Sequence, residues 1–378
     1  MSAPRFDTHH RAIATWLIVC CGFVLAMLVV GGLTRLTNSG LSMVEWKPVT
    51  GVIPPLSEAQ WQAEFEKYKQ FPEFKLVHFH FELSDFKRIY AYEFSHRLLG
   101  RLTGLVFALP LAFFVARRAV PGALARRLVG LLALGSLQGF VGWWMVKSGL
   151  VDRPDVSALR LATHLGLALL LFSALLWTAL DLLRTGTAPA PSPEQRRLAL
   201  IQRGLWIWTF TTALSGALVA GLDGGVGYNT FPLMNGYVVP PGMFLLDPGW
   251  VNVYQNPVLA QFNHRGLAIG LVVAVLWTWS WARTVPLGPG QRRALNAQAA
   301  MALVQVTLGI STLLSVVWIP LAATHQLGAL ALLGLTTVCN HALWRPLASE
   351  AGAGHATILA RGPGGEPCPL SPAVSAQD

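Results

Sequence analysis

Glu93, His96 and Arg97 place a carboxylate, an imidazole and a guanidinium in one short stretch at the start of a long apolar segment. In an α-helix, positions i, i+3 and i+4 share a face, so these side chains project together. Ionisable groups in a membrane segment are costly and usually face a partner or a cavity. The stretch is therefore a candidate site for proton transfer by the carboxylate and metal ligation by the imidazole.

The pattern returns at residues 261–265, where Gln261 replaces the glutamate while His264 and Arg265 keep the spacing. Two further histidines, His164 and His325, each follow Ala-Thr in a later apolar segment. A lone histidine near a membrane interface is usually an anchor or a hydrogen-bonded core residue. Four histidines at equivalent places indicate instead a shared chemical role.

Two imidazoles that face each other across a helical bundle suit bis-axial ligation of haem iron, whose large apolar ring suits a bundle interior. Zinc is the alternative metal, although no carboxylate or thiolate cluster accompanies the histidines at zinc-binding spacing. Arg97 and Arg265 follow their histidines directly and are expected to pair with haem propionates, the alternative being an anchor at the membrane interface. Four other histidines are expected to be bystanders: His78, His80, His341 and His355.

Glu93 distinguishes the first site from the second, because Gln261 cannot transfer a proton. This difference predicts that the chemistry takes place in the first half of the chain. The second half would then hold a permanent electron-transferring cofactor. The alternative role for Glu93 is that of a buried ion-pair partner of Arg97 or Arg101.

The composition predicts an all-α polytopic membrane protein, because 53% of the 378 residues are hydrophobic and only 12% are charged. Eight apolar segments are long enough to cross a bilayer. They are residues 13–36, 90–116, 125–147, 158–183, 200–222, 258–283, 294–317 and 320–343. The net charge of +10 is concentrated in short connections between these segments, which favours a positive-inside membrane protein over a nucleic-acid-binding one.

Arginines fill the second, fourth and sixth connections, whereas the fifth, residues 222–257, contains no Lys or Arg. The positive-inside rule therefore places both termini in the cytoplasm and the four histidines toward the outer leaflet. The first connection, residues 37–89, carries a capping-box pattern at Ser57 and predicts a short amphipathic helix.

Landmarks recur in the same order in the two halves of the chain. Gly31-Gly-Leu-Thr34 resembles Gly216-Ala-Leu-Val219, and the pair Gln138 and Gly142 matches Gln305 and Gly309. A duplication predicts two pseudo-symmetric four-helix bundles related by an axis along the membrane normal. The expected divisions are an N-terminal half at 1–185, a cytoplasmic linker at 186–197, a C-terminal half at 198–345 and a disordered tail at 346–378.

At these residues the chain resembles the haem A synthase family, whose members make haem A for cytochrome oxidase. The resemblance rests on G-G-x-T-R-L-T-x-S-G-L-S at 31–42, E-F-x-H-R at 93–97 and the ordered four-histidine pattern, and it covers nearly all of residues 12–345. M-V-E-W-K-P at 43–48 is similar to the proteobacterial and mitochondrial branch. The resemblance implies oxidation of the C8 methyl group of haem O to a formyl group by successive hydroxylations.

By the same resemblance, His96 and His164 would address the iron of the substrate haem, His264 and His325 would ligate a resident haem b, and Glu93 would be the catalytic acid/base. The implied setting is the bacterial inner membrane, with haem O delivered by haem O synthase and with cytochrome oxidase assembly factors as further partners. Some relatives carry a cysteine pair in the first outer loop, which this chain lacks, so reducing equivalents must arrive otherwise. Two other functions remain open: a di-haem b electron-transfer protein of the quinol or ferric reductase type, and a haem carrier or transporter.

Overall fold

The computed structural model describes residues 6–47, 50–151, 154–184 and 190–343, and this part of the chain forms helices and no strands. The helices are α1 (Phe6–Leu36), α2 (Glu58–Tyr68), α3 (Pro72–Leu76), α4 (Leu83–Ala116), α5 (Gly122–Gly149), α6 (Ala158–Leu183), α7 (Pro193–Gly221), η1 (Gly249–Val251), α8 (Asn252–Gln255), α9 (Pro257–Ala282), α10 (Pro289–Leu314) and α11 (Ile319–Leu343). Within the described residues, 8 helices are long and apolar enough to cross a membrane. The predicted all-α polytopic architecture is confirmed.

Several spans, among them α1, α4 and α7, begin earlier than the apolar pattern predicts, because polar residues extend the helices beyond their apolar windows. α4 begins at Leu83 and α7 at Pro193. The Ser192 side chain accepts a hydrogen bond from the Gln195 backbone N–H, and Pro193 occupies the first helical position. The first turn of α7 therefore takes up part of the expected linker. Residues 185–189 of that region lie outside the described residues, as does the expected tail with His355 and Cys368.

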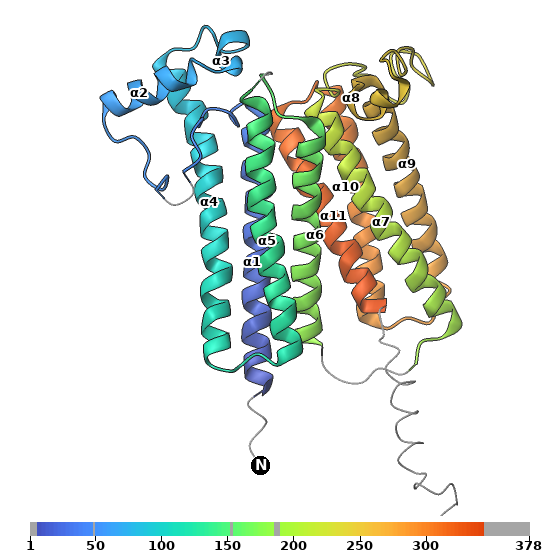
Figure 1. Cartoon of the computed structure of the whole chain (residues 1–378). Coiled ribbons are helices and arrows are strands. Elements are labelled where there is room, and N and C mark those ends of the chain that lie inside the picture. Colours follow the sequence, from blue (N-terminus) through green and yellow to red (C-terminus); the bar gives the residue numbers. More distant parts are fainter. Residues whose placement is uncertain (1–5, 48–49, 152–153, 185–189, 344–378) are drawn as a thin grey trace, which may run out of the picture.

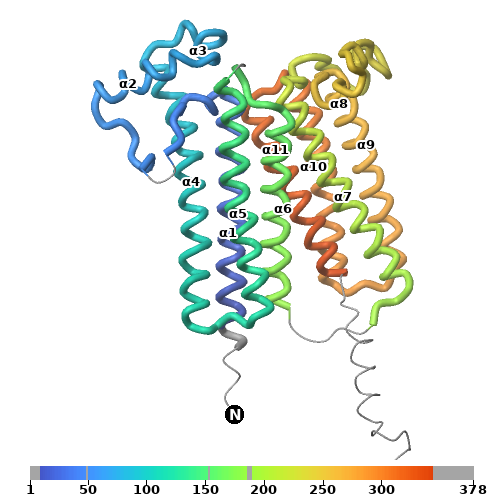
Figure 2. The backbone as a smooth tube through the Cα atoms, viewed as in Figure 1, coloured from blue at the N-terminus to red at the C-terminus, as the bar shows by residue number. Residues whose placement is uncertain are grey.

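The long helices run side by side, with α1, α4, α5 and α6 on one side of the molecule and α7, α9, α10 and α11 on the other (Figure 1). α1 packs against α4 and α6, and α7 packs against α9 and α11. The two groups meet where α6 contacts α7 and α11, and where α1 contacts α11. The backbone trace in Figure 2 shows α2, α3 and α8 gathered at the end of the molecule opposite the N-terminus.

Apolar side chains fill the centre of the helix array and also cover much of its outside. The largest buried cluster joins α1, α4, α5, α6 and α11, and Leu128 and Leu333 within it are 0% exposed. On the outward faces, Leu109, Ile207 and Val273 remain 65%, 61% and 62% exposed. Such exposure of large apolar side chains along spanning helices is what contact with lipid requires.

Residues 57–82, which we call the cap, fold over the N-terminal end of α4. The predicted capping box at Ser57 is confirmed at the start of α2. An aromatic cluster attaches the cap, with Phe65 and Tyr68 from α2 packed against Phe86 of α4. Because residues 86, 90, 93 and 97 repeat at helical spacing, the α4 face that carries the cap is also the face that carries Glu93.

Candidate functional site

The four predicted histidines share one packing arrangement, in which the imidazole ring lies against a glycine of a neighbouring helix. The pairs are His96 with Gly31, His164 with Gly142, His264 with Gly216 and His325 with Gly309. A Cβ added at any of these glycines would approach the ring to between 2.8 and 3.0 Å. That is closer than the roughly 3.5 Å of ordinary carbon contact, so a side chain at these positions would displace the imidazole.

His264 and His325 face each other with ring centroids 6.4 Å apart and ring planes at 84°. Two metal–nitrogen bonds of about 2 Å each, together with the distance from each nitrogen to its ring centre, span roughly the same distance. Nδ1 of His264 lies 2.9 Å from Ser215 Oγ, and Nδ1 of His325 lies 3.1 Å from Gln305 Nε2. No hydrogen bond from a described residue to Nε2 of either ring is found, so this atom of each histidine would be available to bind a metal.

His96 and His164 are held less completely. Nε2 of His164 lies 3.3 Å from Gln138 Nε2, and its Nδ1 is buried without a hydrogen-bond partner. No hydrogen bond to the His96 ring is found among the described residues, and no ring contact joins His96 to His164 there. An unpartnered buried imidazole nitrogen is costly unless something binds it. This pair therefore fits a site that receives its metal with an incoming ligand.

Gln138 and Gln305 support their histidines in the same way, a role that the sequence analysis missed. Each amide donates from Nε2 to the backbone carbonyl of its histidine, at 3.0 Å for His164 and 2.9 Å for His325. Each Oε1 is buried without a partner. The recurring Gln-x-x-x-Gly spacing carried the signal, because positions i and i+4 of one helix present both the amide and the glycine to the same ring.

Glu93 is 3% exposed, and the described structure occupies both of its carboxylate oxygens. Oε1 accepts a hydrogen bond from Arg97 Nη2 at 2.5 Å. Oε2 accepts from Ser42 Oγ and from the backbone N–H of Met43, both at 2.7 Å. These are the contacts of the ion-pair alternative, and they join α4 to the connection that follows α1.

The two arginines fasten the connections beside the sites. Arg97 donates to the carbonyls of Met43 and Glu45, at 2.7 and 3.0 Å. In the same register, Arg265 donates to the carbonyls of Tyr228 and Thr230 at 2.5 and 2.8 Å.

The neighbouring Gln261 donates to the Gly227 carbonyl at 2.8 Å, where Glu93 instead accepts from Ser42 and Met43. The side chain at this position is thus a hydrogen-bond acceptor in the first half, as Glu93, and a donor in the second half, as Gln261. Both arginines, by contrast, donate to loop carbonyls in the same way. In this structure the guanidinium groups contact loop carbonyls, and Nε of Arg265 is buried without a partner.

Helix α1 contacts His96 and the residue that follows His325 through two adjacent glycines. Gly31 receives the His96 ring, and a Cβ added at Gly32 would overlap Oε1 of Gln326. Gln326 directly follows His325, and its Nε2 donates to the Leu28 carbonyl at 3.3 Å. Gln326 is an insertion relative to the first half of the chain, because Ala-Thr-His-Leu-Gly at 162–166 corresponds to Ala-Thr-His-Gln-Leu-Gly at 323–328.

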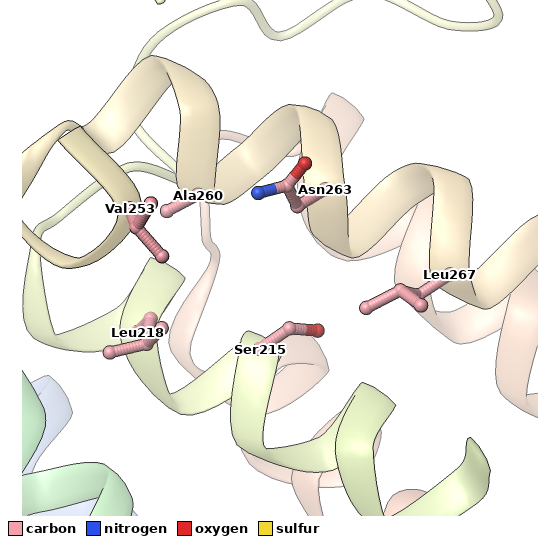
Figure 3. A pocket seen from close by; sticks show the side chains of 6 residues that line it. All are labelled: Ser215, Leu218, Val253, Ala260, Asn263 and Leu267. Carbon is pink, nitrogen blue, oxygen red and sulfur yellow. The ribbon is translucent and has the colours of Figure 1, made fainter. Parts of the chain in front are cut away.

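A groove of about 290 Å³ opens between α7 and α9 beside the second pair. Figure 3 shows Ser215 and Leu218 of α7 facing Ala260, Asn263 and Leu267 of α9. Ser215 lines the groove, and its hydroxyl also contacts Nδ1 of His264. The groove therefore lies next to the residue that holds the His264 ring. Within the described residues, no three His, Cys, Asp or Glu side chains assemble into a metal-binding group, so the candidate ligands come in histidine pairs.

Two of the expected bystander histidines are buried and hydrogen-bonded. His78 is 6% exposed and lies 2.7 Å from the Tyr68 hydroxyl, and burial lowers the pKa of its imidazole. His341 is 8% exposed, and its Nε2 lies 2.9 Å from Oδ1 of Asp181. Sequence alone carried no signal for these partners, because they come from distant helices or from across a turn. His80 is exposed.

Comparison with known proteins matches the arrangement to one family. The chain is 52% identical over 339 residues to the "Heme A synthase" of Rhodospirillum centenum, covering 89% of each chain. It is 48% identical over 336 residues to the "Heme A synthase" of Nitrosospira multiformis, covering 89% of this chain and 94% of the relative. It is 45% identical over 341 residues to "Heme A synthase COX15" of Bos taurus, covering 89% and 81%. Residues 14–337 match the family COX15-CtaA, described as "Cytochrome oxidase assembly protein", and the chain belongs to that family.

Proposed function

We propose that this chain is a haem A synthase, a membrane oxidoreductase that converts the C8 methyl group of haem O to a formyl group by successive hydroxylations. The observation that carries the proposal is the similarity, over most of the chain, to relatives named for this activity. The four histidine–glycine pairs supply the matching site, because they offer two places where imidazoles lie ready for iron.

His264 and His325 would hold a resident haem b through their Nε2 atoms. A bound haem b supplies one-electron transfer. The chain's part is to fix both rings: Gly216 and Gly309 set their depth, and Ser215 and Gln305 hold their Nδ1 atoms. Binding of iron through Nε2 would require the proton of each neutral ring to sit on Nδ1.

His96 and His164 would bind the iron of the substrate haem O. The less complete support of these rings suits a ligand that must enter and leave, whereas a permanent cofactor benefits from fixed ligands. Glu93 would act as acid/base for this site, as the only carboxylate in the two matched His-Arg stretches. It would do so from its position against Ser42 and Met43, which orients the carboxylate.

Arg97 and Arg265 would serve the haems from the loop side. By holding the carbonyls of the connections after α1 and α7, they fix the chain segments beside each site. The unpartnered Nε of Arg265 is the donor that would face a propionate.

We further propose that the four helices on each side are pseudo-symmetric bundles that arose by duplication. Support comes from the matched histidine–glycine pairs and from the arginine contacts in equivalent register. The arginine-rich connections would face the cytoplasm with both termini, in a bacterial inner membrane, and the haem sites would lie toward the periplasm. Haem O would come from the enzyme that makes it, and delivery of the product would involve cytochrome oxidase assembly factors.

The proposed activity is tested by extracting haem from membranes of cells that make haem O, with and without this chain. Haem A should appear only with the chain present, and its absence would refute the proposal. The assignment of the halves is tested separately with His264→Ala and His325→Ala. Each variant should lose the low-spin spectrum of the resident haem, and a retained spectrum would reverse the assignment.

A further inference from the structure

Tyr68, Glu73 and His78 form a buried hydrogen-bonded cluster in the cap. They are 0%, 5% and 6% exposed. The Tyr68 hydroxyl donates to Glu73 Oε2 at 2.9 Å and lies 2.7 Å from His78 Nδ1. Because the hydroxyl has one proton and gives it to Glu73, the His78 nitrogen must be the donor in the second contact. The three groups therefore form a chain of donors, from His78 through Tyr68 to Glu73.

The surrounding chain holds this geometry fixed. Tyr68 ends α2 and stacks on Phe86 of α4 at a centroid distance of 5.3 Å. The backbone N–H of His78 donates to the Glu73 carbonyl at 3.0 Å, closing the end of α3. The His78 ring stacks on Phe81 at 4.0 Å. His78 also lies one residue from the exposed Phe79 and two from the exposed His80, so one end of the cluster is next to the surface.

The other end of the cluster is connected to the first site through Met43 and through the electrostatic effect of Glu93. Burial raises the pKa of Glu73 to about 8, and the negative charges of Glu93 and Asp155 raise it further. The hydrogen bond from Tyr68 and the positive charge of Arg35 act in the opposite direction and lower this pKa. Those charged groups belong to α4, to the connection between α5 and α6, and to α1. Met43 links the two regions, since it packs against the Tyr68 cluster while its backbone N–H donates to Glu93.

We propose that His78, Tyr68 and Glu73 form a proton relay through which the first site exchanges protons with the aqueous phase. The inference rests on the proposed function, because oxidation of a methyl group breaks C–H bonds and moves protons. Glu73 gives the proton of its protonated carboxyl group, through water between them, to the Glu93 carboxylate, the proposed acid/base of the first site. Tyr68 then passes its O–H proton to Glu73 while taking the Nδ1 proton of His78, and His78 regains one from water at Nε2.

The alternative is that the cluster only holds the cap together, and variants with matched controls separate the two roles. Tyr68→Phe keeps the packed ring and removes the hydroxyl, with Tyr92→Phe as the control at a partly exposed tyrosine on α4. Glu73→Gln removes the proton carrier, with Glu66→Gln as the control at an exposed carboxylate on α2. All variants are made in the full chain with its resident haem.

The first measurement needs no turnover. Infrared spectra recorded from about pH 6 to pH 9 should show a protonated carboxyl band that titrates near pH 8. The band should be lost in Glu73→Gln, shifted in Tyr68→Phe and unchanged in both controls. A band that persists in Glu73→Gln overturns the relay, whether or not the chain makes haem A.

The second measurement is haem A formation across the same pH range in water and in D₂O. Tyr68→Phe and Glu73→Gln should slow it about tenfold or more with haem content unchanged, and should alter both the pH profile and the solvent isotope effect. Unaltered profiles, or losses that follow unfolding of the cap as reported by limited proteolysis, overturn the relay. If the parent chain makes no haem A, the proposed function fails and the infrared result alone decides the cluster's role.

Discussion

Gly216→Ala should weaken the binding of the proposed resident haem by displacing His264, its proposed ligand. A Cβ at residue 216 would lie 3.0 Å from Cε1 of His264. To reach ordinary carbon contact, the ring or α7 must retreat by roughly 0.5 to 1 Å. Metal–ligand distances tolerate only about 0.2 Å, so the displaced imidazole cannot keep its bond without strain elsewhere.

The expected cost follows from overpacking, which is about 1 to 3 kcal/mol in a packed interior. At about 1.4 kcal/mol per tenfold change, this corresponds to a loss of roughly 10- to 100-fold in haem affinity. Purified Gly216→Ala protein should therefore carry less haem and show a weakened low-spin spectrum. Haem content per polypeptide and the absorption spectrum measure both effects.

The matched control on the same helix is Gly204→Ala. Residue 204 is exposed, and no atom lies within 4 Å of a Cβ added there. Alanine in a helix interior is favoured over glycine by about 0.5 to 1 kcal/mol, so this variant should keep its haem and fold at least as stably. If Gly216→Ala binds haem as well as Gly204→Ala does, the reasoning from ring contact is wrong. Gly142→Ala, with Gly139→Ala as its control, should spare the resident haem and impair only the first site.

Three further predictions follow from other contacts. Gln305→Leu removes the amide that holds the ring and backbone of His325, so it should lower the affinity for the proposed resident haem by about 10- to 100-fold. Gln138→Leu removes the equivalent amide at His164 and should leave that haem in place. Equal haem loss in the two variants would contradict the pairing of each amide with one site. Glu93→Gln should retain haem while haem A formation falls by about a hundredfold, and unchanged turnover would leave Glu93 as a purely structural partner of Arg97. The pKa of Glu73 is raised from 4.5 to about 8, so the folded chain binds this proton more tightly than the unfolded chain, and the resulting stabilisation is complete below pH 4.5 and is lost as the pH rises through 8. Hydrogen exchange of the α2 amides should therefore quicken over that pH range in the parent chain. If the exchange in Glu73→Gln depends on pH equally, the dependence comes from another group.

Much of this architecture can be predicted from the sequence, because a bilayer imposes simple requirements on the length and polarity of the helices that cross it. The eight apolar segments correspond to eight helices, and the capping box at Ser57 begins α2 as expected. The histidines could be chosen because ionisable residues in apolar segments are rare and these recur in order. Helix ends were less predictable, since the polar first turns of α4 and α7 carry no apolar signal.

Contacts between distant residues escaped the sequence argument for a physical reason. The amide supports of His164 and His325 depend on which helix packs beside which, and no local pattern states this. The Tyr68–Glu73–His78 cluster likewise depends on how α3 turns back onto α2. Glu93 shows the opposite case: its spacing from Arg97 allowed the ion pair to be considered, but only the structure shows that the carboxylate also holds the connection after α1.

The adjacent glycines of α1 have a consequence for modularity. Gly31 accepts His96, and Gly32 accepts the side chain next to His325. Since consecutive Cα atoms lie about 3.8 Å apart, one peptide unit of α1 separates the contact with His96 from the contact with Gln326, the neighbour of His325. If the two halves were separated, Gly31 would keep its contact with His96, whereas Gly32 would lose its contact with Gln326, the residue next to His325. α1 therefore connects the two halves, and a shift of α11 at Gln326 would act on the helix whose next residue, Gly31, contacts His96.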